Sequence, residues 1–213
     1  MPPARRRAWH AVRTTVATAA LVAAAVLLVM GLTSGSSTAT LPDLDGRPVV
    51  VEETPDAEGA DLRATGGRFV APEHALDVPL VEMTVTGGTL NPPTFTDAFV
   101  LRDPDRVTPQ GTRPLVVALH AVRSGRAPGN AFFEPGSPDP AVLVRPGAEV
   151  VVDGATYVVE RTEVLGKAQA ARSRDIWGAL PDGGDRLVVI TCLQRSDATG
   201  HAVENLVLHA VRA

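Results

Sequence analysis

The sequence predicts a mainly β domain preceded by one N-terminal transmembrane helix. Two observations indicate the β domain: from residue 69 onward short apolar runs alternate with turn residues, and the 213-residue chain holds 19 Gly and 18 Pro, which favours many short elements over long helices. A third observation indicates the membrane helix: residues 14–32 form an uncharged apolar run. Because aromatic residues make up only 4% of the chain, the core of the β domain has to consist mostly of Val, Leu and Ala.

The apolar run at residues 14–32 is long enough to cross a membrane. As a helix it spans about 28 Å, close to the roughly 30 Å of a bilayer's hydrocarbon core. Four arginines precede it and no basic residue follows until Arg47, so the positive-inside rule leaves residues 1–13 in the cytoplasm and exports the rest. A cleaved signal peptide is the alternative, with small residues at 33–39 for cleavage. We expect a single-pass cell-membrane protein whose main domain is extracellular.

Residues 33–68 have the composition of a flexible tether, rich in Ser, Thr, Gly, Pro and acidic residues, with only residues 49–51 resembling a strand. Residues 69–213 then form the exported domain. Without the four N-terminal arginines, the chain has 16 basic and 24 acidic residues, a net charge of −8. Nucleic acid is therefore not an expected partner, because binding its phosphates needs a basic surface.

The exported domain contains eight predicted strands and one predicted helical stretch, at residues 168–180. Asp153-Gly154 between two apolar runs is a strong signal for a two-residue hairpin. Short strands at this spacing predict an antiparallel barrel or sandwich. The predicted strands are residues 69–71, 80–85, 99–102, 115–120, 149–152, 156–164, 186–192 and 205–210.

Cys192 is the only cysteine, which excludes an internal disulfide and a multi-cysteine metal site. It ends an apolar run that is typical of a buried strand, and the residues after it turn polar at once. A free thiol in an oxidising, exported compartment is a liability unless it is used. Cys192 is therefore a candidate nucleophile, and a buried core cysteine is the alternative.

A thiol is mostly protonated at neutral pH and needs a base or a cationic neighbour to act as a nucleophile. His120 directly follows the apolar run 115–119, so it stands at a strand end as Cys192 does. If the two strands are neighbours in register, the imidazole and the thiol face the same opening; a structural histidine is the alternative. The other histidines lie before the predicted span, in polar loops or on the last strand: His10, His74, His201 and His209.

Several motifs together resemble the sortase family. The run 188–192, Val-Val-Ile-Thr-Cys, is similar to the family's Thr-Leu-x-Thr-Cys strand, and 117–120, Val-Ala-Leu-His, is similar to its apolar-x-Gly-His motif with Leu in place of Gly. Residues 143–152 resemble the family's following hairpin. Residues 205–210, Asn-Leu-Val-Leu-His-Ala, resemble the last strand of the short actinobacterial, class E/F-like branch. The resemblance covers residues 69–213.

The resemblance implies a closed eight-stranded sortase-like β-barrel with a short helix in a long loop. It implies a cysteine transpeptidase that cleaves an exported protein between Thr and Gly of a C-terminal Leu-Pro-x-Thr-Gly-like signal and forms a thioester. An amine of a lipid-linked peptidoglycan precursor or of a pilin lysine then resolves the thioester. No cofactor and no metal are implied. A catalytically silent anchored binding module and a cysteine hydrolase of the same fold are the alternatives.

The resemblance also implies roles for individual residues. Cys192 is the nucleophile, and His120 pairs with the thiolate and protonates the leaving amine. Sortases carry a third residue, an Arg on the last strand, but the matching position holds Asn205 or its neighbour Glu204, so Arg195 is the nearest substitute. Substrate contacts are expected from Thr191, Asn205 and Trp177.

Overall fold

The computed structural model describes residues 40–51, 61–84, 90–109 and 111–213. The expected cytoplasmic tail at 1–13 and the expected membrane span at 14–32 lie outside these residues. In the part of the chain that is described, no helix combines the length and the apolar character needed to cross a bilayer.

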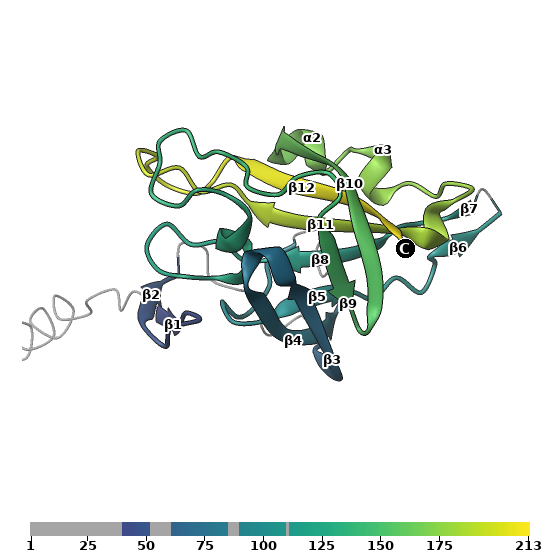
Figure 1. Ribbon diagram of the computed structural model, residues 1–213, viewed down its shortest axis with the longest axis horizontal. Helices are drawn as coiled ribbons and strands as arrows, with labels where there is room; N and C mark the ends of the chain where they lie inside the picture. Colours follow the sequence, from purple (N-terminus) through teal and green to yellow (C-terminus); the bar gives the residue numbers. More distant parts are fainter. Residues whose placement is uncertain (1–39, 52–60, 85–89, 110) are drawn as a thin grey trace, which may run out of the picture. The chain divides into compact units, whose positions relative to one another are not determined.

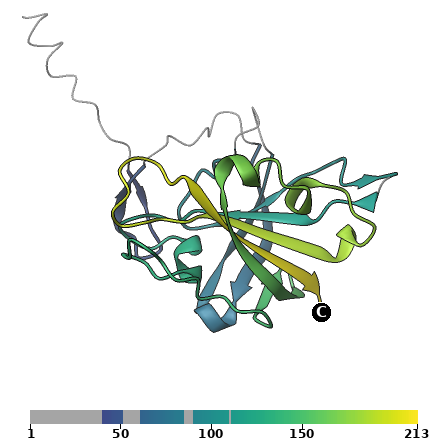
Figure 2. The same ribbon diagram turned by 90° about the horizontal axis from the view of Figure 1, so that it is seen from above.

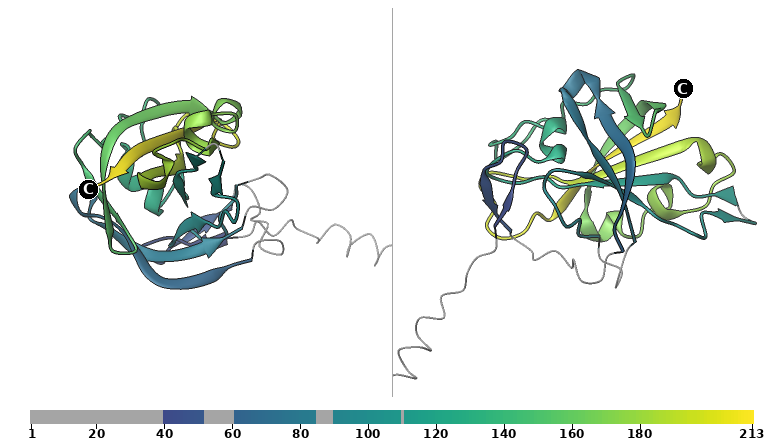
Figure 3. Two further views of the ribbon diagram at one scale, coloured as in Figure 1. Left: turned by 90° about the vertical axis from the view of Figure 1, so that its right-hand side faces the viewer. Right: turned by 90° about the horizontal axis from the view of Figure 1, so that it is seen from below.

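Eight of the described strands close into a barrel, in the order β10-β12-β11-β8-β5-β4-β3-β9. Figure 1 labels these strands, and the left view of Figure 3 looks along the barrel and shows them surrounding a common interior. The closed eight-stranded barrel expected from the resemblance is confirmed. The strands are β3 (Arg63–Ala71), β4 (Leu76–Met83), β5 (Ala98–Leu101), β8 (Leu115–Leu119), β9 (Glu149–Val152), β10 (Ala155–Gly166), β11 (Arg186–Cys192) and β12 (Glu204–Arg212).

The barrel is mixed, which corrects the antiparallel arrangement predicted from strand spacing. β8 runs parallel to β11, and β4 runs parallel to β5. The physical reason is visible in the sequence of β8 and β11, which are apolar at nearly every position and are buried on both faces, as parallel strands usually are.

The predicted two-residue hairpin is confirmed between β9 and β10. Val152 pairs with Ala155, and Asp153 and Gly154 make the turn with positive φ angles of 50° and 78°. Two positive φ angles are the requirement of a tight hairpin turn, and Gly and Asp adopt them more readily than other residues.

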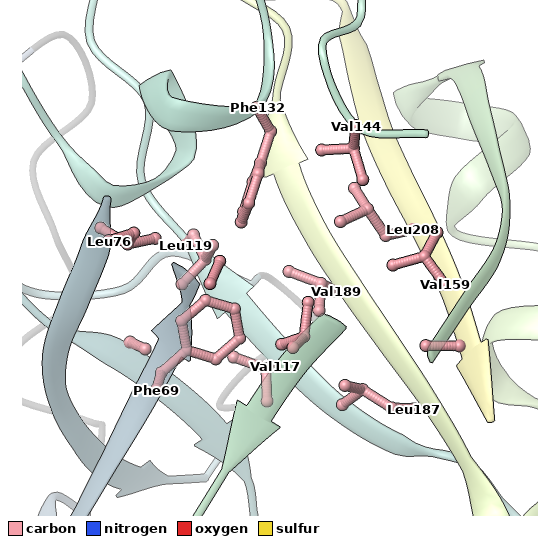
Figure 4. Close-up of a cluster of buried hydrophobic side chains, with 14 of the residues drawn as sticks. Phe69, Leu76, Val117, Leu119, Phe132, Val144, Val159, Leu187, Val189 and Leu208 are labelled. Carbon is pink, nitrogen blue, oxygen red and sulfur yellow. The ribbon is translucent and has the colours of Figure 1, made fainter. Parts of the chain in front are cut away.

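The barrel interior is filled by one large apolar cluster, shown in Figure 4. Val117 and Leu119 of β8 reach into it from one strand, and Leu187 and Val189 of β11 reach into it from the neighbouring strand. Because side chains alternate along a strand, the residues between them face outward.

A second apolar cluster covers the outer face of the same strands. Ala118, Ile190 and Val207 belong to it, and Ile176 lies fully buried against it. Ile176 comes from α3 (Arg174–Trp177), which follows α2 (Lys167–Ala170); Figures 1 and 2 show both short helices outside the barrel. The predicted helical stretch at 168–180 is therefore two separate turns of helix.

The described parts of the expected tether at 33–68 are folded. β1 (Thr40–Pro42) and β2 (Pro48–Val50) form an antiparallel hairpin, and β3 begins already at Arg63. Remote residues order these parts: Asp43 is 2% exposed and binds the backbone of Arg126. The remaining short elements are β6 (Val107–Thr108), β7 (Gly111–Thr112), and the 3-10 turns η1 (Pro72–His74), η2 (Pro128–Phe132) and η3 (Gly183–Asp185).

Candidate active site

The register of β8 and β11 brings His120 and Cys192 to neighbouring positions. The two strands are parallel, and their last pair is Leu119 with Thr191. One residue further along each strand stand His120 and Cys192. Residues that leave adjacent parallel strands at the same point emerge side by side at one end of the sheet. The condition stated for the sequence, that the two strands be neighbours in register, is therefore met.

Cys192 belongs to a row of residues that crosses three hydrogen-bonded strands. On β12 its partner is Asn205, and on β10 the partner of Asn205 is Leu165. The residues one step earlier in the β11–β12 ladder, Thr191 and Leu206, are buried toward the interior. Cys192, Asn205 and Leu165 therefore share the outer face, and each is half-buried, so the sheet holds Cys192 without burying it completely.

Contacts with Pro92, Phe95 and Gly129 hold His120. Its Nε2–H donates a hydrogen bond to the carbonyl oxygen of Pro92. Its ring meets the ring of Phe95 edge to face, with centroids 4.9 Å apart and an interplanar angle of 88°. Its own carbonyl accepts a 2.7 Å hydrogen bond from the N–H of Gly129. Both the imidazole and the backbone of His120 are thus fixed by segments remote in the sequence.

Two amide side chains, which sequence reasoning missed, brace the loops around the pair. Gln194 donates from Nε2 to the carbonyl of Ala121 at 3.1 Å, linking the residues that follow Cys192 to those that follow His120. Asn130 accepts hydrogen bonds from the N–H groups of Val122 and Ala127 and donates to the carbonyl of Val122. No local signal marks Gln194, whose partner is 73 positions away. Asn130 binds within its own loop, and its place two residues after Pro128 at the start of a 3-10 turn is a local signal that could have found it.

Thr191, expected to contact substrate, lies on the inner face. It is 2% exposed, and its strand neighbours Leu119 and Leu206 belong to the interior cluster. Its Oγ1 packs against Gly129 and has no hydrogen-bond partner among the described residues. The structure therefore places Thr191 on the inner face and Cys192 on the outer face of β11.

Arg195, expected to be the third catalytic residue, is engaged by two carboxylates. Its guanidinium contacts Glu204 at 2.8 Å and Asp139 at 3.1 Å, and it also donates to the carbonyl of Pro138. The hydrogen bond to Glu204 and then that to Asp139 raise the pKa of Arg195 above its ordinary value. Glu204 precedes Asn205 on β12, so the two point to opposite sides of the strand.

Trp177, expected to contact substrate, is placed beside the outer face of the barrel. It packs against the outer apolar cluster that includes Ile190 and Val207, the residues next to the row of Cys192. Its Nε1–H donates to the carbonyl of Ala170 at 2.8 Å, which ties α3 to α2. The indole is half-buried, so part of its surface is available to a ligand.

The remaining described histidines do not pair with the strand residues around Cys192. The ring of His74 meets the ring of Phe132 edge to face, and His201 is exposed. His209 is 1% exposed on β12, opposite Arg161 and Val188. Burial, and next the charge of Arg161, lower the pKa of His209 to about 4. Its place and its neutral state both argue for a structural role.

No protein-family model matches the chain, and no curated protein sequence matches it significantly. Among solved structures it is similar to sortase A of Listeria monocytogenes, with 16% identity over 71% of this chain and 88% of that one, at a TM-score of 0.47. A lid mutant of Corynebacterium diphtheriae sortase A has 16% identity over 74% of each chain, also at 0.47. A Streptococcus pneumoniae sortase C-1 mutant has 14% identity over 69% of this chain and 65% of that one, at 0.45. The chemistry of the site has to be argued from the residues of this chain.

Proposed function

We propose that this protein is a membrane-anchored, extracytoplasmic cysteine transpeptidase of the sortase type. The observation that carries the proposal is the in-register parallel pairing of β8 and β11, which ends in His120 on one strand and Cys192 on the other. A thiol and an imidazole at adjacent strand ends are the combination that nucleophilic cysteine catalysis needs. The same two residues carry the sequence resemblance to sortases.

The first half of the reaction forms a thioester. The Cys192 thiolate attacks the Thr carbonyl carbon of a Leu-Pro-x-Thr-Gly-like signal, and the C–N bond to Gly breaks. His120, which has taken up the thiol proton of Cys192, gives that proton to the departing Gly amine. In the second half, an amine of a lipid-linked peptidoglycan precursor or a pilin lysine attacks the thioester and regenerates the thiol, which leaves the sorted protein joined through a new amide bond.

The developing negative charge on the substrate carbonyl oxygen needs a hydrogen-bond donor. Asn205 is opposite Cys192 on the neighbouring strand and shares its face, so its side-chain amide is the donor that the geometry favours. Arg195 is the alternative donor, and it has to leave Glu204 or Asp139 to serve. We expect Asn205→Ala to lower turnover more than Arg195→Ala does; the reverse order assigns the role to Arg195.

The half-buried Trp177 lies against the outer cluster next to the reactive row, and we propose that it contacts the apolar residues of the sorting signal. The expected membrane span at 14–32 then places the enzyme, the exported substrate and a lipid-linked acceptor at one membrane surface, which raises their effective concentrations. Trp177→Ala is expected to raise KM for a signal peptide more than it lowers kcat.

The deciding experiment measures thiol reactivity in the native full-length chain. Iodoacetamide at neutral pH is expected to label Cys192 rapidly, and His120→Ala is expected to slow the labelling, whereas the exposed-histidine control His201→Ala leaves it unchanged. If Cys192 labels only after denaturation, the chain is a silent binding module and the proposal is wrong.

A second assay separates the transpeptidase from a hydrolase. A peptide carrying the sorting signal is incubated with the protein, with and without hydroxylamine. A transpeptidase is expected to turn over faster with hydroxylamine and to yield the hydroxamate of the Thr carboxyl group. Cleavage that gives only the free acid, at a rate independent of hydroxylamine, assigns the chain to the hydrolase class.

A further inference from the structure

The β1–β2 hairpin packs on the segments that hold His120. Leu41 and Val49 of the hairpin, and Val51 directly after it, contact a small apolar cluster that is separate from the barrel core. That cluster is made of Phe95, Val122 and Ala127. Phe95 is the residue whose ring contacts the His120 imidazole, and Val122 lies two residues after His120.

A buried carboxylate locks the hairpin in place. Asp43 accepts a 2.9 Å hydrogen bond from the N–H of Arg126, in the loop that follows His120, and Leu44 donates to the carbonyl of the same Arg126 at 2.8 Å. The other oxygen of Asp43 accepts the N–H groups of Asp45 and Arg47 and closes the hairpin turn. These hydrogen bonds, that from Arg126 first, lower the pKa of Asp43, so the lock is charged at neutral pH.

The contact with Pro92 selects a proton position on His120. A carbonyl oxygen can only accept a hydrogen bond, so Nε2 of His120 has to carry the proton. In the neutral imidazole this leaves Nδ1 as the proton acceptor. The edge-to-face contact with Phe95 fixes the plane of the same ring. Pro92 and Phe95 belong to one buried stretch of the loop that precedes β5.

We propose that the β1–β2 hairpin and the 90–97 loop together are a positioning device, which holds His120 with Nε2 protonated and Nδ1 as its proton-accepting nitrogen. The hairpin supports Phe95 from behind, Phe95 supports the imidazole, and the Pro92 carbonyl sets the tautomer. This inference rests on the proposed function, because the position of His120 matters for catalysis only if His120 acts on Cys192. The residues that act through His120 are Asp43, Phe95 and the backbone of Pro92.

The test uses nitrogen-15 NMR of the full-length chain labelled at histidine, with the His120 signals assigned by comparison with His120→Gln. The wild type is expected to show a proton on Nε2 of His120. Asp43→Ala and Phe95→Leu are expected to shift His120 toward a mixture of tautomers, and Phe95→Tyr, which keeps the ring, is expected to retain the wild-type signal. Arg47→Ala is the control in the same turn, because the Arg47 side chain is 75% exposed and the backbone N–H that Asp43 accepts stays in place.

Iodoacetamide labelling of Cys192 is measured on the same proteins. Asp43→Ala and Phe95→Leu are expected to slow labelling by about tenfold or more, because small misplacements of a catalytic group have large effects on rate. Circular dichroism identifies any variant that has lost the barrel. If both folded variants keep the wild-type tautomer and labelling rate, the positioning proposal is wrong while the proposed function stands. If the wild-type thiol does not label, the proposed function is wrong. The NMR measurement of the His120 tautomer in the variants then still tests whether the hairpin and the 90–97 loop position the ring.

Discussion

The buried histidine of the last strand predicts how the stability of the barrel depends on pH. His209 is 1% exposed, and both of its ring nitrogens lack a hydrogen-bond partner among the described residues. The nearest carboxylate oxygen, Oε2 of Glu163, is 3.7 Å from Nε2, which is too long for a hydrogen bond. Burial, and then the nearby Arg161, lower the pKa of His209 to about 4 from the ordinary value of 6.5.

This difference in the pKa of His209 between the unfolded and the folded chain sets the sign and the size of the pH dependence of stability. Between pH 6.5 and 4 the unfolded chain binds a proton at residue 209 that the folded barrel does not bind, so the free energy of unfolding falls as the pH falls. At 1.36 kcal/mol per pKa unit, His209 alone removes about 2 kcal/mol between pH 7 and pH 5, and about 3 kcal/mol by pH 4. Above pH 7 the contribution of His209 no longer changes.

The assay is urea unfolding at pH 7, 6 and 5, a window in which most carboxylates keep their charge. His209→Gln removes the titrating group and is expected to flatten the dependence of the unfolding free energy on pH. His201→Gln removes an exposed histidine and is expected to leave the wild-type dependence unchanged. The reasoning is refuted if His209→Gln loses as much stability between pH 7 and pH 5 as the wild type does.

Three further substitutions test the packing around the site. Gly129→Ala places a Cβ about 2.0 Å from Oγ1 of Thr191 and 2.7 Å from the carbonyl oxygen of His120. We therefore expect the free energy of unfolding in urea to fall by roughly 1–3 kcal/mol and the labelling of Cys192 to slow. A variant as stable as the wild type would contradict the close packing. Thr191→Val removes a buried hydroxyl without a partner, so an unchanged or higher free energy of unfolding and unchanged turnover are expected. A loss of turnover in a stable variant would show that Thr191 contacts the substrate. Gly154→Ala, at a φ of 78°, is expected to lower the free energy of unfolding by about 1 kcal/mol without changing turnover, and a neutral result would show that the hairpin turn adapts.

The features of the fold and site that could be predicted from the sequence are those that depend on neighbouring residues. Short stretches of sequence favour a strand, a turn or a loop by themselves. Examples are the apolar runs of β8 and β11, the Asp153-Gly154 turn and the polar residues after Cys192. The eight predicted strands accordingly overlap the eight barrel strands. His120 and Cys192 could be proposed as a pair only because both directly follow such runs.

The pairing of those strands was decided by tertiary structure. Nothing local specifies that β8 lies parallel to β11, or that Leu119 is opposite Thr191, because register is set by burying two apolar faces at once. The same pairing turns Thr191 into the interior although it adjoins Cys192. The antiparallel pairing of β11 with β12 brings Glu204 close to Arg195, and Asp139, 56 positions away, is a second carboxylate partner of Arg195.

By itself, the sequence determined where strands form, where the chain turns and which two residues stand at strand ends as candidates for chemistry, since these depend on residues a few positions apart. Only the tertiary structure decided that Pro92 and Phe95 hold the imidazole and that Asp43 anchors a hairpin beside them. Such contacts join segments tens of residues apart, and they form only after folding has overcome the entropy of bringing those segments together.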